Sequence, residues 1–330
     1  MASSFPSKYM STSEEFPIHF HGWLRINKDG RCERFIGNDI VPAGVDLFTG
    51  VHSKDVLISR ESNVFVRIYI PKTIRKRKLP TFIYYHGGGF LIESASSSTY
   101  HPTLNLITQE SNVIAVSVNY RLAPEHLIPT AYEDSWEAIK WVDTHANGNG
   151  PESWLNDYAD LENVYFAGDS AGANIAHNMA IRVGLSPVKF INLKGVILIH
   201  PYFGGKDPIG VEDKTKKHQH HKAFMDQMWL LANKSGVGLD DPLYNPAMDP
   251  RISDFGCLKI LVCLGEKDKL KCRGLNYKKV IEKSGWKGKV VVMESKGEGH
   301  VFFLSNVSSE NARILRTRIC MFINPIRSKS

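Results

Sequence analysis

The chain has 330 residues, 42% of them hydrophobic, which is enough to fill the core of one large domain that folds alone. The net charge is +7, but Asp and Glu are interspersed with Lys and Arg nearly everywhere, so we interpret the charge as solvated surface and predict no nucleic-acid partner. The five cysteines are scattered and include no CxxC pair, a pattern that indicates neither a disulfide scaffold nor a zinc site and fits a reducing compartment.

The N-terminal segment does not resemble a targeting signal. Residues 1–16, MASSFPSKYMSTSEEF, have no apolar run behind a basic start, and Glu14 and Glu15 argue against a transit peptide. No stretch approaches the roughly 18 apolar residues that a membrane helix needs, so we predict a cytoplasmic protein that does not engage a membrane. The densest basic run, residues 72–78, lies between two strand-like segments, and we interpret it as an exposed loop rather than an anion patch or import signal.

Seven apolar, β-rich runs recur along the chain. They cover residues 64–70, 81–85, 113–119, 164–167, 196–200, 260–264 and 290–293. Several are apolar throughout rather than alternating, which is typical of strands that are covered on both faces. Helical patterns lie at 130–144, 171–183 and 309–323. Alternating strands and helices predict a mostly parallel sheet with helices on both faces, in which ligands bind outside the carboxyl ends of the strands.

Two stretches do not fit this alternation: about residues 1–60, and about residues 203–240. The second contains an amphipathic segment, FMDQMWLLAN, after a charged run. Because insertions at the carboxyl edge of a sheet shape a pocket without disturbing the core, we expect both stretches to form a cap. The sequence has no internal repeat, low-complexity tract or linker, so we predict that residues 1–330 form a single domain.

The strongest motif is Gly168-Asp169-Ser170-Ala171-Gly172, which follows a strand-like segment and precedes a helix-like one. This is the context that the G-x-S-x-G motif requires. A nucleophile elbow holds its serine in a strained turn, and side chains at the glycine positions would clash with neighbouring backbone. The helix start also supplies the free N–H of Ala171 and the positive end of the helix dipole. The pattern predicts Ser170 as a nucleophile, with a glycine-rich turn and an N-capping serine as the alternative.

Upstream, His86-Gly87-Gly88-Gly89-Phe90 follows the strand-like TFIYY. Backbone amides stabilise an oxyanion only if no side chain shields them, and consecutive glycines expose them and permit a sharp turn. We therefore predict the N–H groups of Gly88 and Gly89 as oxyanion-hole donors. We expect His86 to stabilise this loop by hydrogen bonding rather than to act as a base.

An acid and then a histidine are expected downstream of the nucleophile in this order of motifs. Asp268 follows the strand-like KILVCLG, and His300 follows KVVVMES, so both lie at carboxyl ends of predicted strands. A neutral imidazole takes the proton of Ser170, and a buried carboxylate fixes the tautomer of that imidazole. We predict His300 as the general base and Asp268 as its orienting acid, with Glu266 the runner-up acid and Asp254 a distant third.

The other titratable residues near these motifs are interpreted as structural or peripheral. Asp169 is expected to point away from the nucleophile and to fix the turn. His126 and His177 fall in a predicted loop and inside a predicted helix. We interpret His218-Gln-His-His, in the predicted cap, as a solvated or pocket-rim cluster, and we predict no metal because no third ligand type stands nearby at motif spacing.

Taken together, these motifs resemble those of the plant carboxylesterases of the hormone-sensitive-lipase group. The resemblance covers nearly the whole chain, from LRINKDGRCERF and VPAGVDLFTGVHSKDVLIS through YYHGGGFLIESA and FAGDSAGANIAHN to LGEKDKL and GEGHVFFL. It implies an α/β-hydrolase fold with a cap built partly from the N-terminal segment, a cytosolic location, no cofactor, and hydrolysis of small esters. The roles in this family fall on Ser170, Asp268 and His300 as the triad, and on Gly88, Gly89 and Ala171 as the oxyanion hole.

The same family includes proteins with other activities. Gibberellin receptors look similar but lack the catalytic histidine, so His300 argues against a receptor. The 2-hydroxyisoflavanone dehydratases share the opening segment and the ESA after HGGGF, some with threonine in place of the serine; Ser170 favours an esterase without excluding a dehydratase. Alkaloid-pathway cyclases use this scaffold too, several with altered motifs, and this sequence has no such alteration. We predict a carboxylesterase, with a dehydratase-like or cyclising lyase as the alternative.

A substrate pocket is predicted from apolar residues near the motifs and in the cap, namely Phe90, Phe203, Phe224, Met228 and Val301. These residues favour small esters with apolar or aromatic groups. Plain packing between cap and sheet is the alternative for them. We expect a small-molecule ester as the binding partner and a monomer or homodimer as the assembly.

Overall fold

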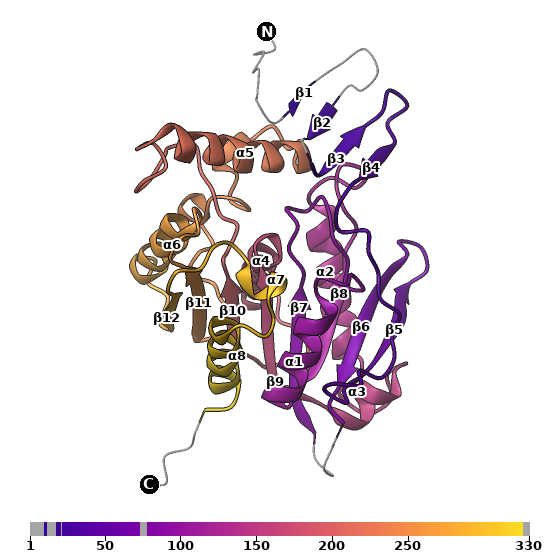
Figure 1. Ribbon diagram of the computed structural model, residues 1–330. Coiled ribbons are helices and arrows are strands. Elements are labelled where there is room, and N and C mark those ends of the chain that lie inside the picture. The colour runs from indigo at the N-terminus through magenta and orange to yellow at the C-terminus, as the bar shows by residue number, and fades with distance from the viewer. Residues whose placement is uncertain (1–9, 12–17, 21, 73–77, 326–330) are drawn as a thin grey trace.

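An eight-stranded sheet forms the centre of the computed structural model, which describes residues 10–11, 18–20, 22–72 and 78–325 (Figure 1). In spatial order its strands are β12 (Lys289–Ser295), β11 (Lys259–Gly265), β10 (Leu193–Ile199), β9 (Ala159–Asp169), β7 (Leu79–Tyr85), β8 (Ile114–Asn119), β6 (Val64–Ile70) and β5 (His52–Ser59). The pairs β5–β6 and β6–β8 are antiparallel, and the other pairs are parallel. The carboxyl ends of the six parallel strands therefore meet at one edge.

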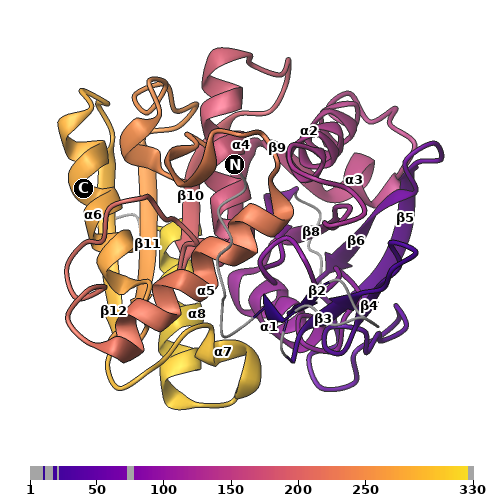
Figure 2. The ribbon, with the colours of Figure 1, turned by 90° about the horizontal axis from the view of Figure 1, so that it is seen from above.

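Helices cover both faces of this sheet (Figure 2). One face packs against α2 (Thr130–Asp143), α4 (Ala171–Leu185) and α6 (Lys271–Lys283), and the other against α1 (His101–Ser111), α7 (Phe302–Ser305) and α8 (Glu310–Ile323). A short helix, α3 (Ser153–Tyr158), precedes β9. Strand β7 contributes to both cores, because Ile83 and Tyr85 belong to the first and Phe82 and Tyr84 to the second. This burial on two faces is the reason that the central strands have continuous apolar sequences.

The elements predicted from the sequence are largely confirmed. Each of the seven apolar runs overlaps one strand of the central sheet, and the three helical patterns correspond to α2, α4 and α8. The predicted mostly parallel sheet with helices on both faces is confirmed as well.

The predicted boundary of the N-terminal cap segment is wrong. Residues 52–59, which we assigned to the cap, form β5 at the edge of the main sheet and pair antiparallel with β6. The strand HSKDVLIS mixes polar and apolar residues and only Ser53 in it is buried, as is usual for an edge strand with one face toward solvent. A search for continuous apolar runs therefore missed it.

Two segments lie above the carboxyl ends of the parallel strands (Figures 1 and 2). One is a small antiparallel sheet of β1 (Met10–Ser11), β2 (Ile18–Phe20), β3 (Leu24–Ile26) and β4 (Cys32–Arg34). The other is the long helix α5 (Lys216–Ala232). The ring of Phe20 stacks on that of Phe224 with centroids 4.9 Å apart, and Trp23 lies edge-on to Phe224 at 5.6 Å. The two segments that we expected to form a cap are thus in contact with each other.

Three features expected from composition can be compared with the fold. All five cysteines are free, in agreement with their scattered positions. Within the described part of the chain, no helix combines the length and the apolar character needed to cross a bilayer. Of the predicted basic loop at 72–78, residues 73–77 lie outside the described residues.

Candidate active site

Ser170 occupies the sharp turn between β9 and α4 that the motif predicts. Its backbone has φ +50° and ψ −117°, a strained combination for a residue with a side chain. A Cβ atom added at Gly168 would lie 2.4 Å from backbone atoms of Gly172, and one added at Gly172 would lie 1.9 Å from the carbonyl oxygen of Tyr85. The glycines are therefore required by close backbone approach, as expected.

Three predicted side chains meet at the carboxyl edge of the sheet. The Nε2 atom of His300 lies 3.1 Å from the Oγ atom of Ser170, and its Nδ1 atom lies 2.8 Å from Oδ2 of Asp268. The other carboxylate oxygen, Oδ1, accepts the N–H of Leu270 at 2.9 Å. The Asp268 side chain is buried, whereas the His300 side chain is 32% exposed at the pocket. The geometry joins a hydroxyl, an imidazole and a carboxylate in one hydrogen-bonded row.

The charges of this row support one another. Burial by itself would raise the pKa of Asp268, but the charge and the hydrogen bond of His300 outweigh it and lower that pKa to about 2. Burial by itself would lower the pKa of His300, but the charge and the hydrogen bond of Asp268 outweigh it and raise that pKa above the ordinary 6.5. Asp268 is therefore ionised at neutral pH and stabilises a proton on the ring of His300.

The neighbouring acids lie where they cannot orient His300. Asp169 is buried beneath the turn, where Tyr84 donates a hydrogen bond to its Oδ1 atom at 2.7 Å and Tyr100 donates one to Oδ2 at 2.9 Å. Burial raises the pKa of Asp169 to about 6. Glu266, the runner-up acid, is exposed and accepts the N–H of Gly297 at 2.7 Å. Asp169 is thus a buried, hydrogen-bonded structural acid, as expected.

The glycine loop after β7 lies beside Ser170. The N–H of Gly87 donates to the Tyr100 hydroxyl at 2.7 Å and is therefore occupied. Gly88 and Gly89 have φ values of +93° and +64° and line the pocket next to Ser170. His86 is buried, its Nδ1 atom lies 2.9 Å from the carbonyl oxygen of Gly87, and its ring stacks on that of Tyr120 at 4.2 Å. His86 thus stabilises the loop, as predicted.

A cavity of about 600 Å³ opens onto Ser170 and His300. Its apolar lining comes from both predicted cap segments, from the glycine loop and from the loop after the histidine, and includes Trp23, Ile92, Phe224, Met225, Met228, Val301 and Leu304. Polar groups line it as well, namely Glu93, Ser98, Thr99, His221 and Ser305. Three of the predicted pocket residues, Phe224, Met228 and Val301, are therefore in the lining.

Two predicted pocket residues are not in the lining, and both predictions are wrong. Phe90 is buried and its ring packs against those of Tyr132, Tyr202 and Trp229. Phe203 is buried and stacks on Tyr277 with centroids 4.8 Å apart. Phe90 and Phe203 lie in the loops that follow β7 and β10, at the carboxyl edge of the sheet where the pocket is, but the backbone turns their rings into the core. Phe90, for example, has a φ of +66°.

Sequence reasoning also missed several residues of the site. Trp23 lies in the N-terminal segment, where only a general cap was predicted. His221 of α5 lines the cavity, in agreement with the pocket-rim interpretation of the histidine cluster. His200 was missed entirely, although it directly follows β10. Its position at the carboxyl end of a strand is the same signal that identified Asp268 and His300.

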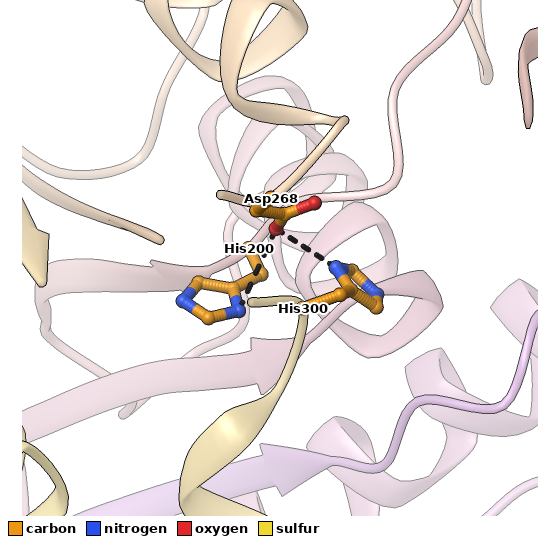
Figure 3. Close-up of side chains that lie close together, drawn as sticks. All are labelled: His200, Asp268 and His300. Carbon is orange, nitrogen blue, oxygen red and sulfur yellow. Dashed lines mark hydrogen bonds and ion pairs between the residues drawn. The ribbon is translucent and has the colours of Figure 1, made fainter. Parts of the chain in front are cut away.

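His200 lies beside Asp268, on the opposite side of its carboxylate from His300 (Figure 3). Its side chain is 1% exposed, and its Nδ1 atom lies 2.7 Å from the backbone nitrogen of Val301 and 3.6 Å from Oδ2 of Asp268. Burial and the nearby His300 lower its pKa to about 3, so the ring is neutral at neutral pH. Because His200 is neutral, it does not form an ion pair with Asp268, and the negative charge of Asp268 stabilises a proton on His300.

Among the described residues, the group with the spacing of a metal site is His200, Asp268 and His300. The nitrogen atoms of both rings that face the carboxylate already take part in hydrogen bonds, with Val301 and with Asp268. A cation between them would have to break both bonds. We therefore interpret the cluster as a hydrogen-bonded network rather than as a ligand set.

Comparison with known proteins places the chain in a family. A sequence model of the α/β-hydrolase fold matches residues 82–304, a range that includes the glycine loop, the turn at Ser170, Asp268 and His300. The chain belongs to the α/β-hydrolase family. This confirms the predicted fold class and the family resemblance.

Similar sequences cover this α/β hydrolase almost completely. It is 42% identical to probable carboxylesterase 2 of Arabidopsis thaliana over 96% of this chain and 99% of that protein. It is 40% identical to the 2-hydroxyisoflavanone dehydratase of Glycyrrhiza echinata over 98% of this chain and 100% of that protein. Its relatives thus include a protein named as a probable carboxylesterase and one named as a dehydratase.

Solved structures share the fold of this chain. A hyperthermophilic esterase from the archaeon Pyrobaculum calidifontis superposes on this α/β hydrolase with a TM-score of 0.70 and 25% identity, over 85% of this chain and 86% of that one. A thermophilic carboxylesterase cloned from a metagenomic library superposes with a TM-score of 0.69 and 26% identity, over 86% and 90% of the two chains.

Proposed function

We propose that this α/β hydrolase cleaves carboxylic esters, with Ser170 as nucleophile, His300 as general base and Asp268 as the acid that orients it. The observation that carries the proposal is the continuous row of hydrogen bonds from Ser170 Oγ through the His300 ring to Asp268. Relatives named carboxylesterase and esterases of the same fold support the same activity. The proton transfers and covalent steps of ester hydrolysis can be carried by these side chains and water, with backbone N–H groups stabilising the oxyanion.

The first half of the reaction acylates Ser170. Its Oγ atom bonds to the ester carbonyl carbon while His300 Nε2 takes the hydroxyl proton, and the carbonyl π electrons move onto oxygen. When the intermediate collapses, the bond to the alcohol oxygen breaks and His300 returns the proton to that oxygen. In the second half, water attacks the acyl group in the same manner and the acid product leaves.

The oxyanion is stabilised by backbone N–H groups beside Ser170. Gly88 and Gly89 line the pocket with open backbones, and Ala171 is the first residue of α4, whose leading N–H groups have no partner within the helix. Each such donor contributes about 10²–10³ in rate. We assign the oxyanion hole to these three residues.

The cavity favours esters with an apolar or aromatic group. Trp23 and Phe224 present aromatic rings to it, and Met225 and Met228 add adaptable apolar surface. We propose that α5 and the small N-terminal sheet act as a cap, since both segments supply these side chains above Ser170.

The free cysteines support a reducing, cytoplasmic location.

A second function is an elimination like that of the dehydratase relative. In that reaction His300 would abstract a proton from carbon, the oxyanion hole would hold an enolate, and Ser170 would form no covalent bond. The similarity to the 2-hydroxyisoflavanone dehydratase over the whole chain favours testing it. A receptor that only binds a hormone is disfavoured, because the site contains an intact row of Ser170, His300 and Asp268.

Covalent labelling separates these functions. We expect a fluorophosphonate probe to label the wild-type protein on Ser170 and to inactivate hydrolysis of p-nitrophenyl acetate in step with labelling. The Ser170→Ala variant removes the nucleophile and is expected to lose about 10⁴–10⁶-fold in kcat while remaining folded. If that variant retains turnover on a 2-hydroxyisoflavanone, elimination is the reaction; if it retains ester hydrolysis, the proposed mechanism is wrong.

A further inference from the structure

His200 occupies a special position in the backbone of the site. It directly follows β10, its φ is +48°, and its N–H donates to the carbonyl oxygen of Cys263 in β11 at 2.8 Å. Its ring lies between the triad and the start of α7, with centroids 5.7 Å from His300 and 5.7 Å from Phe302. The ring therefore contacts the segments that carry both the acid and the base.

The hydrogen bond from Val301 determines where the proton of His200 lies. A backbone N–H only donates, so the Nδ1 atom of His200, 2.7 Å away, must accept with its lone pair. The proton of the neutral ring is then on Nε2, which has no partner among the described residues. The ring of His300 has the opposite tautomer, because its Nδ1–H donates to Asp268.

The accepted N–H belongs to the residue that follows the general base. Val301 has φ +46° and ψ +33°, a left-handed conformation that is unusual for a β-branched residue. Such a conformation persists only when the surroundings impose it. The bond to His200 fixes the peptide between His300 and Val301 and, with it, the direction in which the imidazole leaves the backbone.

We propose that His200 is a positioning residue for ester hydrolysis: its Nδ1 atom holds the N–H of Val301 and thereby keeps Nε2 of His300 in reach of Ser170. The inference rests on the proposed function of the triad. The opposite tautomer of His200 would direct an Nδ1–H at Oδ2 of Asp268, which lies 3.6 Å away and already accepts from His300. It would also leave the N–H of Val301 without its acceptor.

Two variants of His200 separate the acceptor from the backbone conformation. Asn and Gly both tolerate the left-handed φ at this position, but only Asn supplies an acceptor at the place of Nδ1. We expect His200→Gly to lower kcat for a p-nitrophenyl ester by about 10–100-fold, because an imidazole displaced by about 1 Å loses up to 10² in rate. KM is expected to change by less than about threefold, since His200 does not line the pocket. His200→Asn is expected to recover most of the lost kcat.

The outcomes distinguish this inference from the proposed function. If His200→Gly is folded and as active as wild type, or if the Gly and Asn variants are equally impaired, the inference is overturned. If Ser170→Ala, measured in parallel, retains ester hydrolysis, the proposed function fails instead.

A measurement on the wild-type protein covers the case in which the glycine variant does not fold. In ¹⁵N spectra of histidine-labelled protein, assigned with His200→Asn, we expect the proton of His200 on Nε2 at neutral pH. A proton on Nδ1 would overturn the inference by itself.

Discussion

The Nε2 atom of His300 lies 3.1 Å from the Oγ atom of Ser170, while the Nδ1–H group of the same ring donates to the buried carboxylate of Asp268. A ring held in this way has one tautomer, with its lone pair directed at the hydroxyl. The protonation state of His300 should therefore control the pH dependence of the reaction.

We expect kcat/KM to fall on the acid side with a midpoint above pH 6.5. The active form has a neutral His300, and Asp268 raises the pKa of that ring above its ordinary value, so the ring stays protonated to a higher pH. Asp268→Asn removes the charge that raises the pKa, so the acid limb is expected to shift to lower pH and the plateau to drop about 10⁴-fold. Measurements of kcat/KM from mild acid to mildly alkaline pH give the midpoint and the plateau for both proteins. An acid limb of Asp268→Asn at the same pH as that of the wild type would contradict the prediction.

Alanine at Gly88 is expected to reduce activity more than alanine at Gly89. A Cβ atom at Gly88 would lie 2.3 Å from the carbonyl oxygen of Ile92, so backbone would have to move, whereas one at Gly89 would meet the flexible side chain of Met228 at 3.0 Å. Displacing one oxyanion donor costs about 10²–10³ in kcat. Steady-state kinetics of both folded variants test the order, and equal losses would contradict it.

Phe224 and Phe203 offer a matched pair for the pocket. Phe224 lines the cavity, so Phe224→Ala is expected to lower kcat/KM for esters with an aromatic group by about tenfold or more, and to affect short aliphatic esters less. Phe203 is buried against Tyr277, so Phe203→Ala is expected to lower the free energy of unfolding by about 3–5 kcal/mol with the ester preference retained. Denaturant unfolding and a substrate series measure the two effects; a changed preference in the Phe203 variant would contradict the assignment.

The stability of the protein is expected to contain a pH-dependent contribution from Asp169. Burial raises its pKa to about 6 from 3.8, so the folded state binds this proton more tightly than the unfolded state. That stabilisation is complete below pH 3.8 and is lost as the pH rises through about 6, by roughly 3 kcal/mol in total. The Asp169→Asn variant has no titrating group at this position, so its free energy of unfolding is expected to lack this dependence on pH. Denaturant unfolding between these pH values, compared for the two proteins, is the measurement, and parallel curves would contradict the prediction.

The central elements were predictable because their burial is simple. The runs at 82–85 and 260–264 consist of apolar and aromatic residues, since both faces of these strands are covered by helices. The edge strand β5 was not predictable from a continuous apolar run, because polar residues on its exposed face interrupt the apolar ones.

The direction of a side chain was harder to predict than its element. Phe203 and Phe224 have the same chemistry and lie in the same predicted cap segment, yet one ring packs into the core and the other lines the cavity. The backbone after β10 and the register of α5 decide between these outcomes, and neither is encoded in a short motif.

The sequence by itself determined the fold class and the nucleophile, because strained turns and exposed amides require glycine at fixed spacing around Ser170 and after β7. It also predicted His300 as the base and left two neighbouring acids, Asp268 and Glu266, as the leading partners for it. Only the tertiary structure decided that Asp268 rather than Glu266 reaches His300, that Trp23 and Phe224 share one cavity, and that His200 accepts the N–H of Val301. The physical reason is that hydrogen bonds and cavities depend on distances of a few ångströms between segments far apart in the chain. Local sequence patterns fix the conformation of each segment but not those distances.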